Sequence, residues 1–375
     1  MRVLHVAAGN LYGGVERILE EIARHGGGRH GFALSFDGRL WNTLSAEGAA
    51  RHMLGPVRFS RPWSVWRARR RLARVLEQDP FDGVIGHSPW AYALVAPVAR
   101  GRHLPRVLWA HDALDGSHWT ERFAGKRTPD HVICNSRYTA HAIERWLTGV
   151  PNDVVYPPVS PVLRDAAARA DVRREFGASA STTVILLASR LERWKGHAEL
   201  LRAGAGLTGD WMIWIAGSAQ RPHEAKYEQD LHRLARALPA GERVRFLGAR
   251  TDVARILQGA DVLCQPNTAP EPFGLVFVEA LSSGVPVVTT DAGGAREIVT
   301  PECGALVVPG DRDALAAVLQ GLIDRPERRR ALGNAGPARA RALCDPATQL
   351  CALERALSWP SSTPRSNTTS SAARP

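Results

Sequence analysis

Two glutamates, Glu271 and Glu279, stand around what reads as the start of a helix. The amides of Gly274, Leu275 and Val276 would be free N–H groups in its first turn, at the positive end of the helix dipole, which suits a diphosphate. One carboxylate would then reach sugar hydroxyls beside the phosphates, and the other would accept from ribose hydroxyls. The alternative is that Glu271 is a helix-start acid and Glu279 a solvated helix residue.

Two cations follow a predicted strand in the second half of the chain. Arg190 lies just after the apolar run Val184–Ala188, and Lys195 comes five positions later, near the next helix start. Two cations on a strand-end loop can neutralise the charge of a departing diphosphate where a metal ion would otherwise be needed. Loops are also often basic merely because they face water, and that alternative stays open.

Paired glycines, Gly13 and Gly14, follow the opening apolar run and precede a helix. Glycines at such a place allow a ligand to approach the backbone closely, or they simply make a tight turn. Together with Gly9 they give the spacing G-x-x-x-G-G. This is not the full G-x-G-x-x-G pattern, which argues against a nicotinamide cofactor.

Two further polar segments carry candidate chemistry. His111 and Asp112 close the apolar run Val107–Ala110, where the pair would hold a sugar hydroxyl or a reacting oxygen, unless His111 is a satisfied interior histidine. Asp311 and Asp313 have the D-x-D spacing that binds a metal in some enzymes. Because Pro309-Gly310 precedes them and a helix follows, we interpret Asp311 as a helix N-cap and predict no metal site.

Short apolar runs alternate with helix-length amphipathic stretches along the whole chain, and this order predicts the elements that must position these residues. Apolar strands that are each followed by a helix indicate parallel sheets covered on both faces, so the predicted class is α/β, doubly wound. The predicted strands are Arg2–Ala7, 33–36, Gly83–Gly86, Val107–Ala110, His131–Cys134, Val184–Ala188, Trp211–Ala216, 243–247, 261–265, 285–289 and 305–308.

About eleven strands are too many for one ordinary domain, and the pattern restarts after the proline-containing segment 154–161. We therefore predict two Rossmann-like domains, residues 1–157 and 158–345, the second opening with a helix near 165–176. Ligands of such sheets lie at the carboxyl ends of the strands, which predicts a cleft between the domains. Residues 346–360 would hold a last helix with Asp345 as its N-cap, and the polar tail 361–375 would be disordered.

Composition narrows the function classes. The 375 residues include 48 Lys and Arg against 37 Asp and Glu, a formal net charge of +11, which favours anionic partners. No apolar run approaches the roughly 18 residues of a membrane-spanning helix, and the first residues lack a signal-peptide pattern, so we expect a cytoplasmic protein. The five cysteines show no metal-ligand spacing and are expected to be reduced and mostly buried.

These elements, in this order, resemble the family 4 retaining glycosyltransferases with the two-domain GT-B fold. The resemblance covers nearly the whole chain except the tail. It is carried by Gly13-Gly14-Val15-Glu16, by Arg190 with Lys195, by Glu271 and Glu279 in an E-x7-E signature, and by the two later glycine-containing segments 284–288 and 293–297.

The resemblance implies roles for both domains and for individual residues. The first domain would bind the acceptor and the second the nucleotide-sugar donor, and the last helix would cross back to the first domain. Arg190 and Lys195 would hold the diphosphate, Glu279 the ribose and Glu271 the transferred sugar, with His111 near the sugar. The catalytic residues implied are thus Glu271, Arg190, Lys195 and His111, and the donor contacts are Gly13, Gly14, Gly274, Leu275, Val276 and Glu279. No metal or other cofactor is implied besides the nucleotide diphosphate sugar as co-substrate.

A basic helix is predicted over residues 62–76, with apolar positions 65, 68, 72, 75 and 76 on one face. Arg67, Arg70, Arg71 and Arg74 crowd its other faces, with Trp63 and Trp66 nearby. This pattern suits an anionic membrane surface and a lipid-linked acceptor, so peripheral contact with the inner face of the cell membrane is one interpretation. The other is an ordinary covering helix with a solvated arginine face.

Three functions remain to be compared. The first is transfer of a sugar from a UDP- or GDP-linked donor to the hydroxyl of a glycan, a lipid-linked saccharide or a small molecule, with retained configuration. The second is a nucleotide-sugar 2-epimerase, which uses a related fold. The third is a non-catalytic polyanion-binding protein, suggested by the net charge of +11. No specific nucleic-acid module is recognisable.

Overall fold

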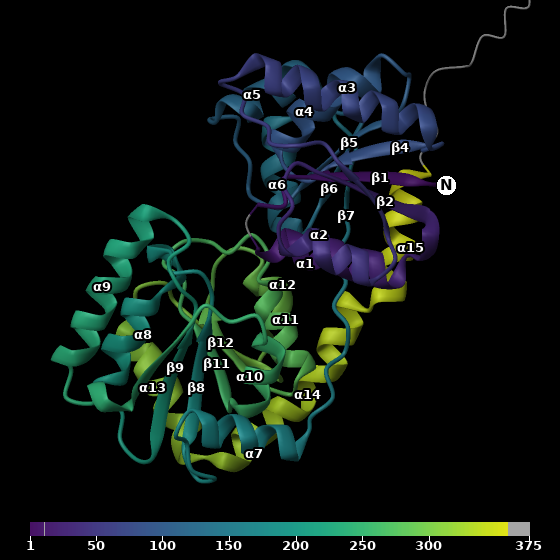
Figure 1. The fold of residues 1–375 in the computed structure, drawn as a ribbon. Coiled ribbons are helices and arrows are strands. Elements are labelled where there is room, and N and C mark those ends of the chain that lie inside the picture. Colours follow the sequence, from purple (N-terminus) through teal and green to yellow (C-terminus); the bar gives the residue numbers. More distant parts are fainter. Residues whose placement is uncertain (11, 359–375) are drawn as a thin grey trace, which may run out of the picture.

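Two parallel sheets, each covered by helices on both faces, make up the molecule (Figure 1). The computed structural model describes residues 1–10 and 12–358, so the expectation of a disordered tail lies outside the described residues. The first sheet has the strand order β3-β2-β1-β4-β5-β6-β7 and the second the order β10-β9-β8-β11-β12-β13. The predicted doubly wound α/β class is confirmed.

The first sheet is formed by β1 (Val3–Ala7), β2 (His30–Leu34), β3 (Ala50–Met53), β4 (Gly83–Gly86), β5 (Arg106–Ala110), β6 (His131–Cys134) and β7 (Asn152–Val154). Its helices are α1 (Gly14–His25), α2 (Arg39–Ala46), α3 (Pro62–Gln78), α4 (Pro89–Arg100), α5 (Trp119–Lys126) and α6 (Arg137–Trp146). The buried side of α1 carries Ile18, Leu19 and Ile22, the spacing of a one-sided helix, and packs on the sheet.

The second sheet is formed by β8 (Thr183–Ala188), β9 (Trp211–Ala216), β10 (Val244–Gly248), β11 (Val262–Gln265), β12 (Val287–Thr290) and β13 (Gly304–Val307). Its helices are α7 (Ala166–Glu175), α8 (His197–Gly204), α9 (Pro222–Ala237), α10 (Val253–Gly259), α11 (Leu275–Ser282), α12 (Ala295–Ile298), α13 (Arg312–Asp324) and α14 (Pro326–Cys344). Residues 155–165 connect the two sheets without helix or strand.

The sequence-based strands are in place with shifted ends, but β3 and β7 were missed. Both are edge strands of the first sheet, and their side chains are exposed or half-buried. An edge strand that is not buried on both faces lacks the continuous apolar run by which the other strands were recognised. The expected strand 33–36 is in fact β2 at 30–34, because His30 and Gly31 are buried strand residues despite their low β-propensity.

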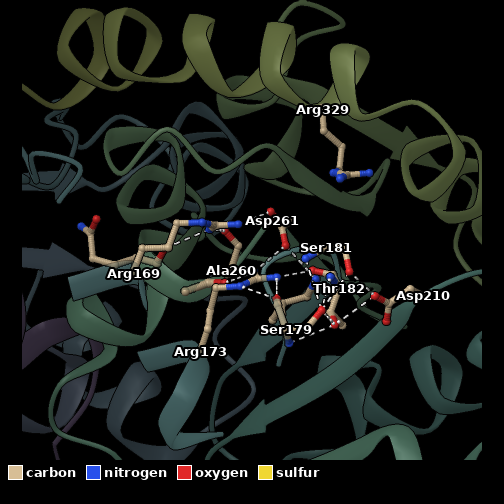
Figure 2. Close-up of polar contacts among 12 residues, drawn as sticks. Arg169, Arg173, Ser179, Ser181, Thr182, Asp210, Ala260, Asp261 and Arg329 are labelled. Carbon is tan, nitrogen blue, oxygen red and sulfur yellow. Dashed lines mark hydrogen bonds and ion pairs between the residues drawn. The ribbon is translucent and has the colours of Figure 1, made fainter. Parts of the chain in front are cut away.

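A buried arginine ties α7 to the amino end of the second sheet (Figure 2). Arg173 is 4% exposed, and its guanidinium donates to the carbonyls of Ser179 and Gly259 and to Asp261 Oδ2 at 2.9 Å. Arg169 donates to the other oxygen of Asp261 at 2.7 Å. Every such buried charge needs compensating partners, and here they come from the turns that precede β8 and β11. This cluster lies at the edge opposite the strand carboxyl ends and is structural.

The last helix, α15 (Pro346–Leu357), belongs to the first unit although it follows α14 of the second (Figure 1). Leu350, Leu353 and Ala356 are buried in the core that α1 and the first sheet share. Asp345 accepts from the Thr348 amide at 2.9 Å and Pro346 follows it, as expected for an N-cap and the first helical residue.

The basic helix α3 is one-sided. Val65, Ala68, Leu72 and Val75 are buried, whereas Trp63 and Trp66 are 62% and 58% exposed. Across residues 1–10 and 12–358, no helix is long and apolar enough to span a membrane. All five cysteines are unpaired thiols, and four of them are buried, as expected; Cys351 is exposed.

Candidate functional site

The loops at the carboxyl ends of both sheets meet where the two units touch; we call this region the interdomain junction. From the first unit it receives the segments after β1, β5 and β6, residues 8–10, 12–17, 111–118 and 135–138. From the second unit it receives the segments after β8, β11 and β12, residues 189–196, 266–279 and 291–297. Side-chain contacts that cross between these segments are described below.

Glu271 is held by three donors that converge on one oxygen. Lys195 Nζ donates to Glu271 Oε2 at 2.8 Å, Asn267 Nδ2 at 2.9 Å and Gln265 Nε2 at 3.1 Å. Glu271 is 7% exposed, and none of these bonds uses Oε1. Lys195 and Glu271, which the sequence placed on separate loops, therefore form one partly buried ion pair. One oxygen of the Glu271 carboxylate lies outside this set of bonds.

The start of α11 depends on its N-cap glycine. Gly274 has φ +104°, and a Cβ there would lie 2.2 Å from Phe277 Cδ2, so only glycine fits without rearrangement. Leu275 and Val276 open the helix, where amides have no carbonyl four residues earlier within the helix. Behind this turn, Gly293 pairs with Glu271, and a Cβ on Gly293 would meet the Glu271 carbonyl at 2.2 Å.

Arg190 lies in the same charged region. Its Nη2 is 2.8 Å from Glu192 Oε1, and its charge also acts on Glu16 of the first unit. Across the junction, the charges of Glu271, Lys195 and Arg190 act on the carboxyl of Asp112. Although Asp112 reaches solvent, desolvation by the surrounding loops and then the charge of Glu271 raise its pKa. Charges from both units therefore share one electrostatic neighbourhood.

Glu279 makes an ion pair that sequence reasoning missed. Arg17 of α1 donates from Nη1 to Glu279 Oε2 at 2.8 Å, and Arg17 Nη2 lies 2.7 Å from Oε1, so the contact is bidentate and joins the two units. Glu279 is 5% exposed. Burial raises its pKa to about 7, although Arg17 opposes the shift.

Gly13 and Gly14 begin α1 at the junction. The Gly13 amide donates to Glu16 Oε2 at 3.0 Å. A Cβ on Gly14 would meet nothing within 4 Å, and one on Gly13 would meet only Glu16 Oε2 at 3.7 Å. Neither glycine is required by packing in the described structure, so the backbone here faces open space that a ligand can approach.

His111 is half-buried, and its ring faces other histidines of the first unit. Its Nε2 is hydrogen-bonded to His87 Nδ1 at 3.1 Å, and its Nδ1 is buried without a partner among the described residues. Burial lowers the pKa of His111 to about 3, so the ring is neutral at pH 7. The adjoining Asp112 reaches the junction, as described above.

Glu297 of α12 caps a helix of the other unit. Its two oxygens accept from the amides of Arg137 and Tyr138, each at 2.9 Å, at the start of α6. Nearby, Ser136 Oγ donates to the Pro272 carbonyl at 2.6 Å. An internal carboxylate thus satisfies the positive end of α6, and the two units are joined by hydrogen bonds beside the Glu271 turn.

Asp311 is the N-cap of α13, as predicted, because its Oδ1 accepts from the Ala314 amide at 2.9 Å. In the part of the chain that the structure describes, no group of three metal-ligating side chains is assembled. Arg17, Gln265 and Asn267 were not singled out from the sequence, and Glu297 was named only as part of the segment 293–297. Gln265 and Asn267 carried a usable signal, since polar residues follow a buried strand at its carboxyl end.

Models of two protein families match the chain. "Glycosyltransferase Family 4" matches residues 12–162, and "Glycosyl transferases group 1" matches residues 168–339. Together the two matches extend over both units.

Two of the similar proteins are named as mannosyltransferases that act on phosphatidylinositol compounds. A GDP-mannose-dependent monoacylated alpha-(1-6)-phosphatidylinositol monomannoside mannosyltransferase of Corynebacterium glutamicum is 30% identical over 293 residues, which is 72% of this chain and 74% of the relative. A phosphatidyl-myo-inositol mannosyltransferase of Mycobacterium leprae is 31% identical over 261 residues, 68% of this chain and 67% of the relative.

Among solved structures, Anabaena Alr3699/HepE in complex with UDP and glucose superimposes with a TM-score of 0.86 at 25% identity. The superposition covers 96% of this chain and 100% of that structure. Both sheets and their connection are therefore shared.

Proposed function

Because the chain belongs to the family 4 glycosyltransferases and has the GT-B fold, we propose that it transfers a hexose from a nucleotide diphosphate sugar to an acceptor hydroxyl with retained configuration. The observation that carries this proposal is the convergence of Lys195, Glu271 and the start of α11 at one place. That place combines a cation, a carboxylate and helix amides, which is what a departing diphosphate and a sugar ring require.

In this proposal the donor diphosphate lies against Arg190, Lys195 and the amides of Gly274, Leu275 and Val276. As the bond from the sugar to the phosphate breaks, negative charge grows on the phosphate oxygens, and fixed cations stabilise it without an essential metal ion. Lys195 stays paired with Glu271, which keeps the ammonium at a fixed position. Glu271 accepts from hydroxyls of the transferred sugar through the oxygen that its three donors leave over.

The remaining roles follow the same arrangement. Glu279 would accept from the ribose hydroxyls with the lone pairs that its two contacts with Arg17 leave free. Gly13 and Gly14 would let the sugar and phosphates approach the start of α1, where a side chain would stand in open space. His111 would contact a sugar hydroxyl, and the acceptor would bind mainly to the first unit.

The nucleotide base and the sugar are proposed only as classes. The Corynebacterium relative is named for GDP-mannose, and the Anabaena structure holds UDP and glucose, so a UDP- or GDP-hexose is the donor we propose. The comparisons favour a transferase over a 2-epimerase, since the named relatives are transferases. Thermal-shift measurements with both nucleotides would identify the base by the larger rise in melting temperature.

The decisive test compares two of the chain's three lysines. We expect Lys195→Ala to lower kcat on the order of 100-fold, because the charge of the leaving diphosphate loses a preorganised partner. The control is Lys226→Ala, an exposed lysine of α9 in the same unit, which should keep full activity. Both are assayed by nucleotide release from the donor, with and without a chelator. Normal turnover in Lys195→Ala would remove the lysine from the site, and loss of wild-type activity in the chelator would refute metal independence.

We also propose that the acceptor is lipid-linked and that α3 meets an anionic membrane surface at the cytoplasmic face. Arg58, Arg61, Arg67 and Arg71 line a cavity of about 340 Å³ with Trp63, and none of these arginines is paired with a carboxylate within the described residues. Arginines that lack acidic partners can bind phosphate headgroups, and exposed tryptophans beside them can lie at the interface between membrane and water. The names of the two relatives specify phosphatidylinositol compounds, which carry phosphate headgroups of this kind.

Liposome flotation tests this surface. We expect wild-type protein to float with vesicles containing 30% anionic lipid, on the order of tenfold more than with neutral vesicles, because each basic residue near the surface contributes about 1 kcal/mol. Arg67→Glu with Arg70→Glu should abolish the difference. Equal flotation of wild type and variant would show that α3 is a solvated covering helix, and salt-sensitive DNA binding without donor turnover would instead support a polyanion-binding protein.

A further inference from the structure

Four histidines form a continuous hydrogen-bonded chain across the first sheet; His30, His5 and His87 are buried, and the last one, His111, is half-buried. His30 Nδ1 and His5 Nε2 are 2.9 Å apart, His5 Nδ1 and His87 Nε2 are 2.8 Å apart, and His87 Nδ1 and His111 Nε2 are 3.1 Å apart. We call these four residues the histidine chain. Only His111 was singled out from the sequence.

The strand register explains how the chain forms. The four histidines belong to neighbouring elements in the order β2, β1, β4, β5, with His87 and His111 just beyond their strands. His30 is level with Val3, and His5 is level with Ile85, so each histidine stands two residues further along than its neighbour. Residues offset by two point to the same face, where diagonal neighbours touch. The histidine chain therefore runs diagonally across the sheet, from the amino end of β2 to the carboxyl end of β5.

All four rings are neutral at pH 7. His5, His87 and His30 are 0%, 3% and 5% exposed. Burial lowers the pKa of His30 to about 4 and that of His111 to about 3, and those of His5 and His87 fall well below the ordinary value. A neutral imidazole has one N–H donor and one bare nitrogen acceptor.

This chemistry forces one tautomer on the whole chain. If His5 carries its hydrogen on Nδ1, it donates to His87 Nε2, and His87 must then carry its own hydrogen on Nδ1 and donate to His111 Nε2. His5 Nε2 is then bare and accepts from His30 Nδ1. If His5 carries its hydrogen on Nε2, every bond reverses. Either all four are Nδ1–H tautomers or all four are Nε2–H tautomers.

The two ends of the chain are open. His30 Nε2 and His111 Nδ1 are both buried and have no hydrogen-bond partner among residues 1–10 and 12–358. His111 Nδ1 is the end next to Asp112 and the interdomain junction. In one tautomeric state it is a donor, and in the other it is an acceptor. The state of His111 is thus tied to that of His30, three strands away.

We propose that His30, His5 and His87 are positioning residues that couple the tautomer which His111 presents at the junction to their own. The proposal rests on the proposed function in one respect, that a hydroxyl of the donor sugar is the partner of His111 Nδ1. A hydroxyl can donate or accept, so the tautomer decides which way it turns. A sugar hydroxyl held in one orientation loses less freedom during transfer.

Imidazole NMR tests the coupling without any substrate. Long-range ¹H–¹⁵N spectra of the full chain labelled with ¹⁵N-histidine, recorded at pH 7, should show the same neutral tautomer at all four positions. In His5→Gln the link is interrupted, and we expect a second tautomer of His111 to appear. Mixed tautomers in the wild type, or an unchanged His111 spectrum in His5→Gln, would overturn the proposal.

A double-mutant cycle tests the consequence for transfer. We expect His30→Gln to lower donor kcat/KM about tenfold in the wild type and to have no further effect in a His111→Ala background, since its action passes through His111. The control is His131→Gln. His131 is a buried histidine at the start of β6 and is not part of the histidine chain. An equal loss in both backgrounds would show a merely structural role. Uniform tautomers without turnover on any donor would refute the proposed function and leave the coupling intact.

Discussion

At the scale of single residues, the charged side chains predicted for the site lie close together, but most of their partners could not be predicted from the sequence. Glu271, Lys195 and Arg190 were recognisable because each follows or begins an element at a strand carboxyl end. Arg17 was not recognisable as the partner of Glu279, since the two lie 262 positions apart and meet only after the units pack. Spacing along the chain gives residues on one element, whereas pairs across elements depend on the tertiary fold.

The buried carboxyl of Glu279 should make stability fall as pH rises. Its pKa is about 7 in the folded protein and near 4.5 in the unfolded chain, so between these values only the folded protein keeps the proton. Raising the pH across this window therefore favours unfolding, by at most about 3 kcal/mol. In Glu279→Gln this penalty is absent. The melting temperature of Glu279→Gln relative to that of the wild type should be higher at pH 8 than at pH 5. An equal difference at both pH values would contradict the raised pKa of Glu279.

At the scale of elements, helix starts decide the geometry of the site. The turn at Gly274 is fixed by its positive φ and by Phe277, whereas the start of α1 at Gly14 is sterically open. Sequence reasoning placed both glycines at helix starts but could not tell a glycine that packing requires from one that it does not. The edge strands β3 and β7 escaped for a related reason, since their residues carry no burial pattern of their own.

Alanine at the two glycines should separate packing from ligand approach. Gly274→Ala should lower the free energy of unfolding by about 1–3 kcal/mol, because a Cβ collides with Phe277 in a left-handed conformation. Gly14→Ala should leave it within about 0.5 kcal/mol, since its Cβ meets nothing. If the donor lies against α1, Gly14→Ala will nevertheless weaken donor binding. Chemical denaturation and donor KM measure the two effects, and an unchanged KM would place the donor elsewhere.

At the scale of the whole molecule, the two-unit architecture was predictable because strand–helix alternation restarts after the proline-containing segment. The contacts between the units were not, and they now include Arg17 with Glu279, Ser136 with Pro272, and Glu297 with the start of α6. Packing of α15 against α1 buries Leu350 and Leu353 in the core of the first unit. The end of the chain therefore contributes to the stability of its beginning.

Truncating one side chain of α15 tests this dependence. Leu353 is 1% exposed, and Leu353→Ala should lower the stability of the first unit by about 2–5 kcal/mol, the usual cost of a cavity at a buried leucine. Leu163→Ala, at a leucine 87% exposed in the connecting segment, is the matched control and should change little. Amide hydrogen exchange in β1 and β2 should be faster in Leu353→Ala than in the wild type. Exchange that is slower or equal would contradict the assignment of α15 to this core.

The chain passes between the units twice, at residues 155–165 and at the corner between α14 and α15, and the two passages are bonded together. The Val159 amide donates to the Cys344 carbonyl at 2.9 Å. Two covalent tethers joined at one spot behave as a single pivot, which permits one unit to swing on the other but resists sliding. A swing about that pivot moves the loops farthest from the tethers most, whereas Arg17 and Glu279 lie close to it, since Glu21 and Ser282 on their helices bond to residues 160–162.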